Sequence, residues 1–301
     1  MSGNTLGSDI NEIHLAYLLN NNSYPDILSQ TQIEKRIKAV SEETTILQKG
    51  RAEAMYNTFL KFLSNKGYGS PVSAYWTSRP GFSFKRIVGI DVNQRLNPTD
   101  VLVGLSNGKF YGISAKSSRS SGVGFKNPGV GTIDKYLSTN LRSIAQKYVN
   151  QIIEEFDLPK FANGRKQVIN ADPNLKKQIM AEYGSPCLRE MRDSYLNAIN
   201  QLDNTQIIDF ISTEWLNENP EILRLPYVKI TGTGTKTFSA NLYDPIGYSQ
   251  TRHLIKGPIS FSSVGNDSVG VTANTYKILK MRFKFESTQL ASSLKMSGDP
   301  W

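Results

Sequence analysis

The sequence predicts an α/β (α+β) protein in which a small mixed sheet is flanked by helices and followed by a β-rich C-terminal region. In the first two thirds of the 301 residues, apolar side chains recur mostly at helical spacing, around a short pair of strand-like segments. From Leu223 onward, alternating apolar and polar residues between Gly and Asn turns are typical of strands. The hydrophobic content of 39% is enough for an ordinary globular core.

This change of pattern predicts two domains, which the chain length also favours. Residues 1–218 would contain the helix-flanked sheet together with additional helices. Residues 219–301 would form a basic β-rich region. Between residues 228 and 301, nine Lys or Arg residues stand against four Asp or Glu residues, so this region carries much of the excess positive charge. Such a charge would suit contacts with a polyanion such as DNA.

Two helical stretches are predicted near the N-terminus. Residues 9–19 have apolar side chains at helical spacing, and Glu12 lies in the first turn at the edge of the apolar face. Residues 30–65 predict one long helix, or two with a break near Gly50, and Glu53 flanks the apolar stripe. For both carboxylates, a solvated or helix-dipole role and a functional role are open.

An aromatic segment follows the second helical stretch. In residues 73–83, Tyr75, Trp76 and Phe82 are interleaved with Arg79. Aromatic side chains beside cations stack bases and bind phosphates, but a strand packed on a helix has the same composition, and both interpretations are open. Residues 84–90 predict a strand that would lie beside the next pair of strands.

Residues 96–116 predict a β-hairpin. One strand begins near Asp100, the other ends at Lys116, and the Ser-Asn-Gly turn at 106–108 joins them. Side chains alternate between the two faces of a strand, so Ser114 and Lys116 share one side of theirs. One carboxylate and one ammonium group therefore lie on neighbouring strands.

The loop at 117–131 is dense in Ser, Gly and basic residues. Small residues let backbone amides approach a phosphate, and Arg119, Lys126 and Asn127 would hold one there, whereas a plain flexible loop is the alternative. Beyond it, helices are predicted over residues 132–157, 174–198 and 204–217, and strands over 227–230, 235–242, 253–259 and 276–285.

The last of these strands has two distinct faces. Lys280, Arg282 and Lys284 alternate with apolar residues, so the three cations form one row. Such a row can follow a nucleic-acid backbone, or it can be a solvated sheet face. The formal net charge of +9 favours a polyanionic partner, with nucleic acid as the leading candidate, because each neutralised phosphate releases condensed counterions.

Several classes of protein are excluded. The segment 232–237 resembles a phosphate-binding loop, but Thr235 stands where that motif requires Gly, and no helix-forming stretch follows, so we interpret it as a β-turn. The chain contains one Cys and two His residues, too few to bind zinc, which excludes a zinc site. We interpret Cys187, which follows Pro186, as a packing residue.

Composition also gives an expected location. The apolar runs are far shorter than the roughly 20 residues that a membrane helix needs. The first ten residues are polar and lack the pattern of a secretory signal. A single Cys excludes an intramolecular disulfide and fits a reducing compartment. We therefore expect a cytoplasmic protein without a membrane partner.

The hairpin residues resemble the PD-(D/E)xK (restriction-endonuclease-like) nuclease superfamily. Pro98-Thr99-Asp100 corresponds to the first part of that motif and Ser114-Ala115-Lys116 to the second, and the resemblance covers roughly residues 40–155. It implies a Mg²⁺-dependent DNA endonuclease with Asp100, Ser114 and Lys116 in the catalytic site. Asp100 and the Ala115 carbonyl would hold the metal, and Lys116 would orient the attacking water.

The sequence departs from the family pattern at Ser114, which stands in place of an acidic residue and is a poorer Mg²⁺ ligand. Some members of the superfamily supply a Glu from a helix instead. Glu53 is the first candidate here and Glu12 the second. If neither reaches Asp100, the alternative is a non-catalytic DNA-binding or assembly protein that retains the fold. Cutting two strands commonly calls for two active sites, so a homodimer is possible.

Overall fold

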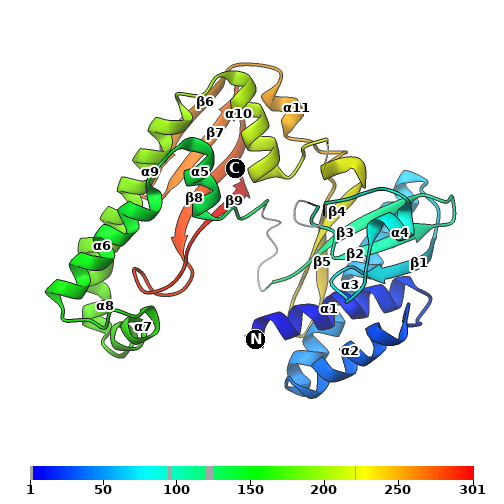
Figure 1. Ribbon diagram of the computed structural model, residues 1–301. Helices are drawn as coiled ribbons and strands as arrows, with labels where there is room; N and C mark the ends of the chain where they lie inside the picture. The colour runs from blue at the N-terminus through cyan, green and yellow to red at the C-terminus, as the bar shows by residue number, and fades with distance from the viewer. Residues whose placement is uncertain (1–2, 94–96, 119–124, 221) are drawn as a thin grey trace. The chain divides into compact units, whose positions relative to one another are not determined.

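The computed structural model describes residues 3–93, 97–118, 125–220 and 222–301 (Figure 1). It divides into two compact units, each built from two chain segments. The first unit comprises Met1–Val123 and Glu218–Ser249, and the second comprises Gly124–Asn217 and Gln250–Trp301. The predicted division at 218/219 differs from this arrangement, because the strands after Glu218 return to the sheet of the first unit.

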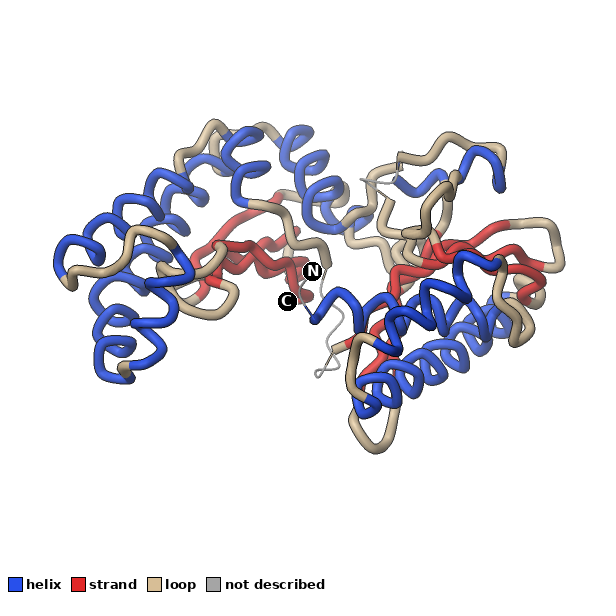
Figure 2. Tube along the Cα trace, turned by 60° about the horizontal axis from the view of Figure 1, so that its bottom comes forward, coloured by secondary structure: helices blue, strands red, loops and turns tan. Residues whose placement is uncertain are grey.

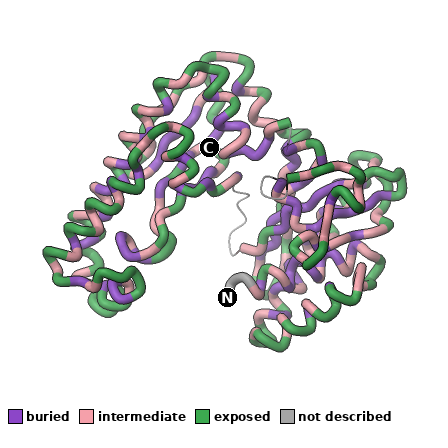
Figure 3. Tube along the Cα trace, viewed as in Figure 1, coloured by how far each residue is buried: buried purple, intermediate pink, exposed green. Residues whose placement is uncertain are grey.

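The first unit contains a five-stranded mixed sheet, which confirms the predicted fold class. Its strand order is β1-β2-β3-β4-β5, with β3 and β4 parallel and the other neighbours antiparallel. Burial is continuous along β2 (Figure 3). The strands span Pro71–Trp76, Val101–Leu105, Phe110–Ser117, Tyr227–Thr233 and Ser239–Tyr243, in the order β1 to β5.

Helices α1 (Gly3–Leu19), α2 (Ile27–Lys38) and α3 (Glu42–Lys66) belong to this unit, and α1 and α3 lie side by side against one face of the sheet (Figure 2). The break in the second helical stretch falls between Lys38 and Glu42 rather than near Gly50, because the Ser41 hydroxyl caps a new helix by accepting from the Thr44 N–H. Gly67, with φ 65°, ends it.

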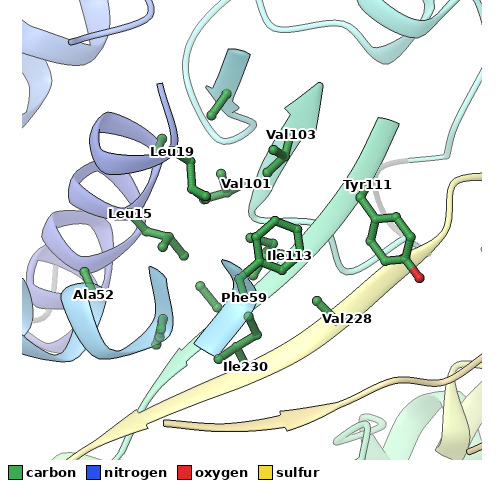
Figure 4. Packing of buried hydrophobic residues seen from close by; sticks show 14 of the residues in the cluster. Leu15, Leu19, Ala52, Phe59, Val101, Val103, Tyr111, Ile113, Val228 and Ile230 are labelled. Carbon is green, nitrogen blue, oxygen red and sulfur yellow. The ribbon is translucent and has the colours of Figure 1, made fainter. Parts of the chain in front are cut away.

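The main core of the first unit lies between these helices and the sheet. Leu15 and Phe59 pack against strand residues such as Val101 (Figure 4). Apolar residues at alternate positions of the strands cover one face of the sheet. Apolar residues at helical spacing on α1 and α3 pack on this face. Burying this surface at about 25 cal/mol per Å² is the main stabilisation that holds α1 and the hairpin together.

The other face of the sheet carries the short helix α4 (Phe84–Val88), whose Phe84 packs with Leu102 and Leu225. The strand predicted over 84–90 is therefore wrong. Gly89, with φ 72°, ends this helix by donating its N–H to the Lys85 carbonyl. A single helical turn buries Phe84 here, whereas a strand would need a partner strand.

The predicted hairpin is formed by β2 and β3. The register pairs Val101 with Ile113 and Leu102 with Gly112. Gly108, with φ 78°, allows the turn, and Asn107 Oδ1 accepts from the Lys109 N–H at 3.0 Å. Turn chemistry and alternation therefore set this register locally.

The second unit consists of a four-stranded antiparallel sheet and most of the helices. The sheet order is β6-β7-β8-β9. Its strands are Ile259–Val264, Ser268–Ala273, Tyr276–Phe285 and Leu294–Pro300, and the helices are α5 (Val130–Leu137), α6 (Leu141–Glu155), α7 (Ala162–Ala171), α8 (Pro173–Ile179), α9 (Ser185–Ile199), α10 (Asn204–Phe210) and α11 (Thr251–Leu254).

Several predicted elements of the later chain differ from the structure. The helix expected over 132–157 is interrupted after α5, where Ser138 has φ 54°. π-Helical turns at Met180–Gly184 and Ile211–Leu216 interrupt the next two helical stretches. The strand expected over 253–259 is wrong, because this segment begins in α11, and β6 starts only at Ile259. Helix α7 and strands β7 and β9 were not predicted.

Within the part of the chain that the structure describes, no helix combines the length and the apolar character that crossing a membrane requires.

Candidate functional site

Asp100 stands immediately before β2, at the end of the sheet where β3 continues beyond its neighbour. Its N–H donates to the Ile113 carbonyl at 2.8 Å. Its Oδ2 accepts from the Ala115 N–H at 2.9 Å and from Lys116 Nζ at 2.9 Å. The carboxylate thus accepts the hydrogen bond that the backbone carbonyl of a further β2 residue would accept from the Ala115 N–H. This bond fixes the carboxylate beside the end of β3.

Lys116 forms an ion pair with Asp100 that remains open to solvent. The Lys116 side chain is 48% exposed and the Asp100 side chain 21%. Solvent screening makes such a pair a weak contributor to stability. The pair therefore contributes little to folding, but it presents an ammonium group and a carboxylate side by side at the surface.

Ser114 and Ala115 complete the strand side of the site. The Ser114 hydroxyl lies 3.5 Å from Asp100 Oδ2, at the outer limit of a hydrogen bond. In an extended strand, the N–H and C=O of one residue point to the same neighbour. Because the Ala115 N–H points to Asp100, the Ala115 carbonyl also points to the side of the sheet on which Asp100 lies.

Arg51 fixes the end of β3 from the helical side. This buried residue of α3 donates from Nη1 to the Ser117 hydroxyl at 2.8 Å and from Nη2 to the Gly234 carbonyl at 2.9 Å. Ser117 follows Lys116, and Gly234 lies in the turn after β4. One guanidinium group therefore ties the strand end that carries Lys116 to the neighbouring turn.

Glu12 brings a second carboxylate to the site from α1. Its side chain is buried, and its Oε2 accepts from the indole nitrogen of Trp76 at 2.9 Å. Burial, and next the negative charge of Asp100, raise the pKa of Glu12 to about 8, while the Trp76 hydrogen bond and the Lys116 charge act in the opposite direction. Glu12 thus interacts electrostatically with both hairpin residues.

Glu53, the first candidate from the sequence, lies elsewhere on its helix. Its side chain is 62% exposed, and its Oε1 lies 3.8 Å from Nε2 of His14. Burial lowers the pKa of His14 to about 4, so this His is neutral at neutral pH and the pair is weak. The charge of Asp100 thus acts on Glu12, whereas the Glu53 side chain lies beside His14 at the surface.

The side chains and the backbone at this end of β3 offer oxygen atoms of the kind that a hard divalent cation binds. Two carboxylates, a backbone carbonyl and a hydroxyl are oxygen donors, which Mg²⁺ prefers, and Mg²⁺ is commonly held by one or two carboxylates together with water and substrate phosphate. Among the described residues, no group of three or more His, Cys, Asp and Glu side chains could hold a metal. Water and phosphate would therefore have to complete the coordination.

The loop residues expected to bind nucleic acid fall into two groups. Arg119 lies outside the described residues. Lys126 and Asn127 belong to the second unit, whereas Asp100 belongs to the first. Lys126 Nζ contacts Glu214 Oε2 at 3.1 Å and the Thr213 carbonyl at 3.2 Å, and Asn127 is exposed. Lys126 therefore also has a structural role.

The predicted basic row lies on β8 of the second unit. Leu279, Met281 and Phe283 are fully buried on one side of this strand, and Lys280, Arg282 and Lys284 alternate with them on the other. Arg282 Nε donates to Asp267 Oδ2 at 3.0 Å. The alternation is confirmed, and the row lies beside two acidic residues, since Asp299 of β9 also pairs with Lys280.

Trp76 is the site residue whose role was missed from the sequence. The segment around it had two interpretations, and the structure supports the strand packed on a helix, because Trp76 lies in β1 and is 2% exposed. Its indole N–H needs a partner when buried. Trp76 and Glu12 are 64 positions apart, so no local sequence pattern indicates that they form a pair.

The turn after β4 and the residue Cys187 agree with their interpretation from the sequence. Gly234, with φ 101°, lies in the turn between β4 and β5, in agreement with a β-turn rather than a nucleotide-binding loop. Cys187 is buried in α9, and burial raises the pKa of its thiol to about 12, which fits a packing residue.

No family model and no curated protein matches the sequence. A structure of restriction endonuclease MspI in complex with its cognate DNA is similar over 88% of this chain and 83% of that chain, at 13% identity and a TM-score of 0.32. A TM-score of this size does not establish a shared fold.

Proposed function

We propose that this protein is a Mg²⁺-dependent deoxyribonuclease, an endonuclease that hydrolyses phosphodiester bonds in DNA. The observation that carries the proposal is the ion pair of Asp100 and Lys116 at the end of β3, whose charges both act on the pKa of the buried Glu12. Phosphodiester hydrolysis needs a nucleophilic water, stabilisation of charge at phosphorus and help for the leaving oxygen. An acidic pair beside a lysine meets these needs with few residues.

Each residue has a distinct proposed role. Asp100, Glu12 and the Ala115 carbonyl would hold Mg²⁺, which, when bound, supplies positive charge to the phosphate and acidifies water. Lys116 would orient the attacking water, since its ammonium group is already held beside Asp100 at 2.9 Å. Ser114 would hydrogen-bond within this shell.

Glu12 adds a proton to the chemistry of the site. Because its pKa is raised to about 8, it holds a proton at neutral pH in the absence of a cation. Carboxylates bind metals in the deprotonated form, so cation binding releases this proton and strengthens as pH rises. Glu53, whose side chain faces His14, is replaced by Glu12 in this proposal.

DNA is the proposed partner because of charge. The net charge of +9 favours a phosphate backbone, and Lys280, Arg282 and Lys284 present cations at alternate positions on one strand. Arg119, Lys126 and Asn127 are proposed as further phosphate contacts. Cutting both strands of a duplex would suit a homodimer, and a cytoplasmic location is also proposed.

Ser114 favours a second candidate function. With a hydroxyl where the superfamily pattern has an acid, the site offers one ligand less for the metal. A non-catalytic DNA-binding or assembly protein would keep the fold and the basic row without needing that ligand.

A cleavage assay separates the two candidates. Plasmid, linear and branched DNA are incubated with Mg²⁺ and the wild type, Asp100→Asn or Lys116→Met. We expect cleavage to fall by at least about 100-fold in both variants. Lys61→Met, at an exposed position of α3, is the matched control and should cleave as the wild type does.

Two outcomes would contradict the proposal. Cleavage that is unchanged in both site variants would place the active site elsewhere. Salt-sensitive DNA binding without cleavage by the wild type, on all three substrates, would support the non-catalytic candidate.

A further inference from the structure

A cavity of about 390 Å³ lies in the first unit, beside the turn of the β2–β3 hairpin. Asp100 lies at the opposite end of β2, so the cavity is separate from the candidate site. Its walls come from the hairpin, the end of α4 and the segment before β4. Its lining includes Tyr68, Lys109, Phe110, Tyr111, Leu225 and Ile246.

The cavity exists because β4 begins late relative to β3. Pairing of the two strands starts at Gly112 and Tyr227, where the Gly112 N–H donates to the Pro226 carbonyl at 2.8 Å. Pro226 has no amide hydrogen, so it cannot extend the ladder backwards. The sheet is therefore narrower beside residues 110 and 111, and side chains rather than a strand surround the space.

Aromatic side chains form much of the wall. The rings of Tyr68 and Tyr111 lie 5.7 Å apart between centroids at 33°, and Phe62 supports Tyr68 from behind at 6.0 Å. Phe110 contributes a further ring to the lining, and Leu225 is buried. The Tyr68 and Tyr111 rings pack against each other, so a flat aromatic ligand would stack on the half-buried Tyr68 and Phe110 side chains that line the space.

The described residues of the lining carry positive charge, from Lys109 and Arg224, which are both exposed. Asp244 lies next to the lining residue Ile246, whose N–H donates to Asp244 Oδ1 at 3.2 Å. Asn107 holds this wall in place, because its side-chain amide donates to the Tyr68 carbonyl at 2.7 Å and its Oδ1 accepts from the Lys109 N–H at 3.0 Å. An anion beside an apolar body is the complementary ligand.

We propose that this cavity binds a nucleotide, with the base against the aromatic side chains and the phosphate at Lys109. A nucleotide combines a flat ring with a negative charge, and the volume lies in the usual range of small-ligand sites, roughly 300 to 1,000 Å³. The same chemistry has two sources: a free mononucleotide, or an unpaired nucleotide of a nucleic-acid strand.

Binding of the four deoxynucleoside monophosphates tests the proposal by titration calorimetry with the whole protein and no divalent cation. We expect at least one of them to bind the wild type, and the matching nucleoside without phosphate to bind about tenfold more weakly. Lys109→Glu, at an exposed position, should weaken nucleotide binding by about tenfold. Lys61→Glu, on exposed α3 surface, should leave it unchanged.

Filling the cavity gives an independent variant. Ile246 is 36% exposed where it lines the cavity, so Ile246→Trp can occupy the space from its surface side and should abolish binding while circular dichroism stays native. Absence of binding of every nucleotide to the wild type would overturn the proposal, as would unchanged binding to a folded Ile246→Trp. Equal affinity for nucleoside and nucleotide would overturn the assignment of Lys109 to the phosphate.

A second arm distinguishes the sources. A duplex with one bulged nucleotide should bind more tightly than the matched duplex, and Ile246→Trp should remove this difference, if the nucleotide comes from a strand. Mononucleotide binding without that difference assigns the cavity to a free nucleotide. Neither arm depends on Asp100 or on cleavage, so failure here is distinguishable from failure of the proposed endonuclease activity.

Discussion

The indole nitrogen of Trp76 donates a hydrogen bond of 2.9 Å to Oε2 of Glu12, joining β1 to α1 inside the first unit. This bond lowers the pKa of Glu12 against the stronger effect of burial, which raises it to about 8. One donor therefore both anchors the carboxylate and favours its charged form. Several consequences of this contact can be measured.

Replacing Trp76 with Phe removes the donor and keeps an aromatic ring. The pKa of Glu12 should rise further, so a pH–rate profile of Mg²⁺-dependent cleavage should move its rising limb to higher pH. The free energy of unfolding should fall by about 1 to 3 kcal/mol, because Glu12 loses its buried partner. Tyr75→Phe in the same strand is the control, and a pH profile displaced equally in both variants would contradict the prediction.

The two helix carboxylates should respond differently to neutralisation. Glu12→Gln should reduce cleavage by at least about 100-fold, because the amide is a poor Mg²⁺ ligand, whereas Glu53→Gln should stay within about twofold of the wild type. Initial rates on plasmid DNA measure both. Loss of cleavage in Glu53→Gln with a normal rate in Glu12→Gln would restore Glu53 as the ligand.

The raised pKa of Glu12 also makes stability depend on pH. The folded state holds a proton that an unfolded Glu, with a pKa of 4.5, releases earlier. The contribution to stability is therefore full below about pH 4.5 and is lost as pH rises through about 8. Denaturant unfolding without divalent cations, between these limits, should show a decline on the order of 3 to 5 kcal/mol from this group.

Glu12→Gln should remove most of that decline, because an amide does not titrate. Below about pH 5 the two proteins should have similar stability, and at pH 8 the variant should be the more stable one. A wild-type curve that runs parallel to the variant across the whole range would show that Glu12 titrates normally.

The basic row should set the salt dependence of DNA binding. Neutralising Lys280, Arg282 and Lys284 to Gln should reduce the slope of log K against log salt by about 0.9 for each phosphate contact that is lost. Fluorescence anisotropy with a duplex at several salt concentrations measures the slope.

A matched triple variant controls for net charge. Lys135→Gln, Lys160→Gln and Lys177→Gln neutralise three exposed cations on helices or loops of the same unit. An equal loss of slope in both triple variants would show that overall charge, rather than the β8 row, attracts DNA.

Cys187 should be unreactive in the folded protein. It is buried, and burial raises the pKa of its thiol to about 12, so little thiolate is available at pH 8. An aromatic disulfide reagent should label it only after unfolding in denaturant. Rapid labelling of the native protein would contradict its assignment as a packing residue.

Local features made the hairpin predictable from sequence. The turn at Asn107 and Gly108, with alternation on either side, determines which residues pair, so the approach of Asp100 to Lys116 followed from a few neighbouring positions. The same reasoning failed at 84–90, where Gly89 was a helix-ending signal that the short apolar run concealed.

Long-range features were not predictable in the same way. Helical periodicity placed Glu12 and Glu53 each at the edge of an apolar face, but the partner of that edge depends on how α1 and α3 cross the sheet. The contact between Glu12 and Trp76 joins segments that only the folded sheet brings together. For the same reason, the change from helical to strand-like sequence patterns near residue 218 could not reveal that the strands directly after it belong to the first unit.

The parallel pairing of Gly112 with Tyr227 has a consequence for synthesis of the chain. When the ribosome has made β1, β2 and β3, the edge of β3 beside Lys116 still lacks its neighbour, and residues 124–217 must be produced before β4 arrives. Closing a loop of that length is slow compared with forming a hairpin. During translation the nascent sheet therefore exposes the unpaired edge of β3. The end of β3 that carries Lys116 gains its neighbouring strand β4 only late in folding.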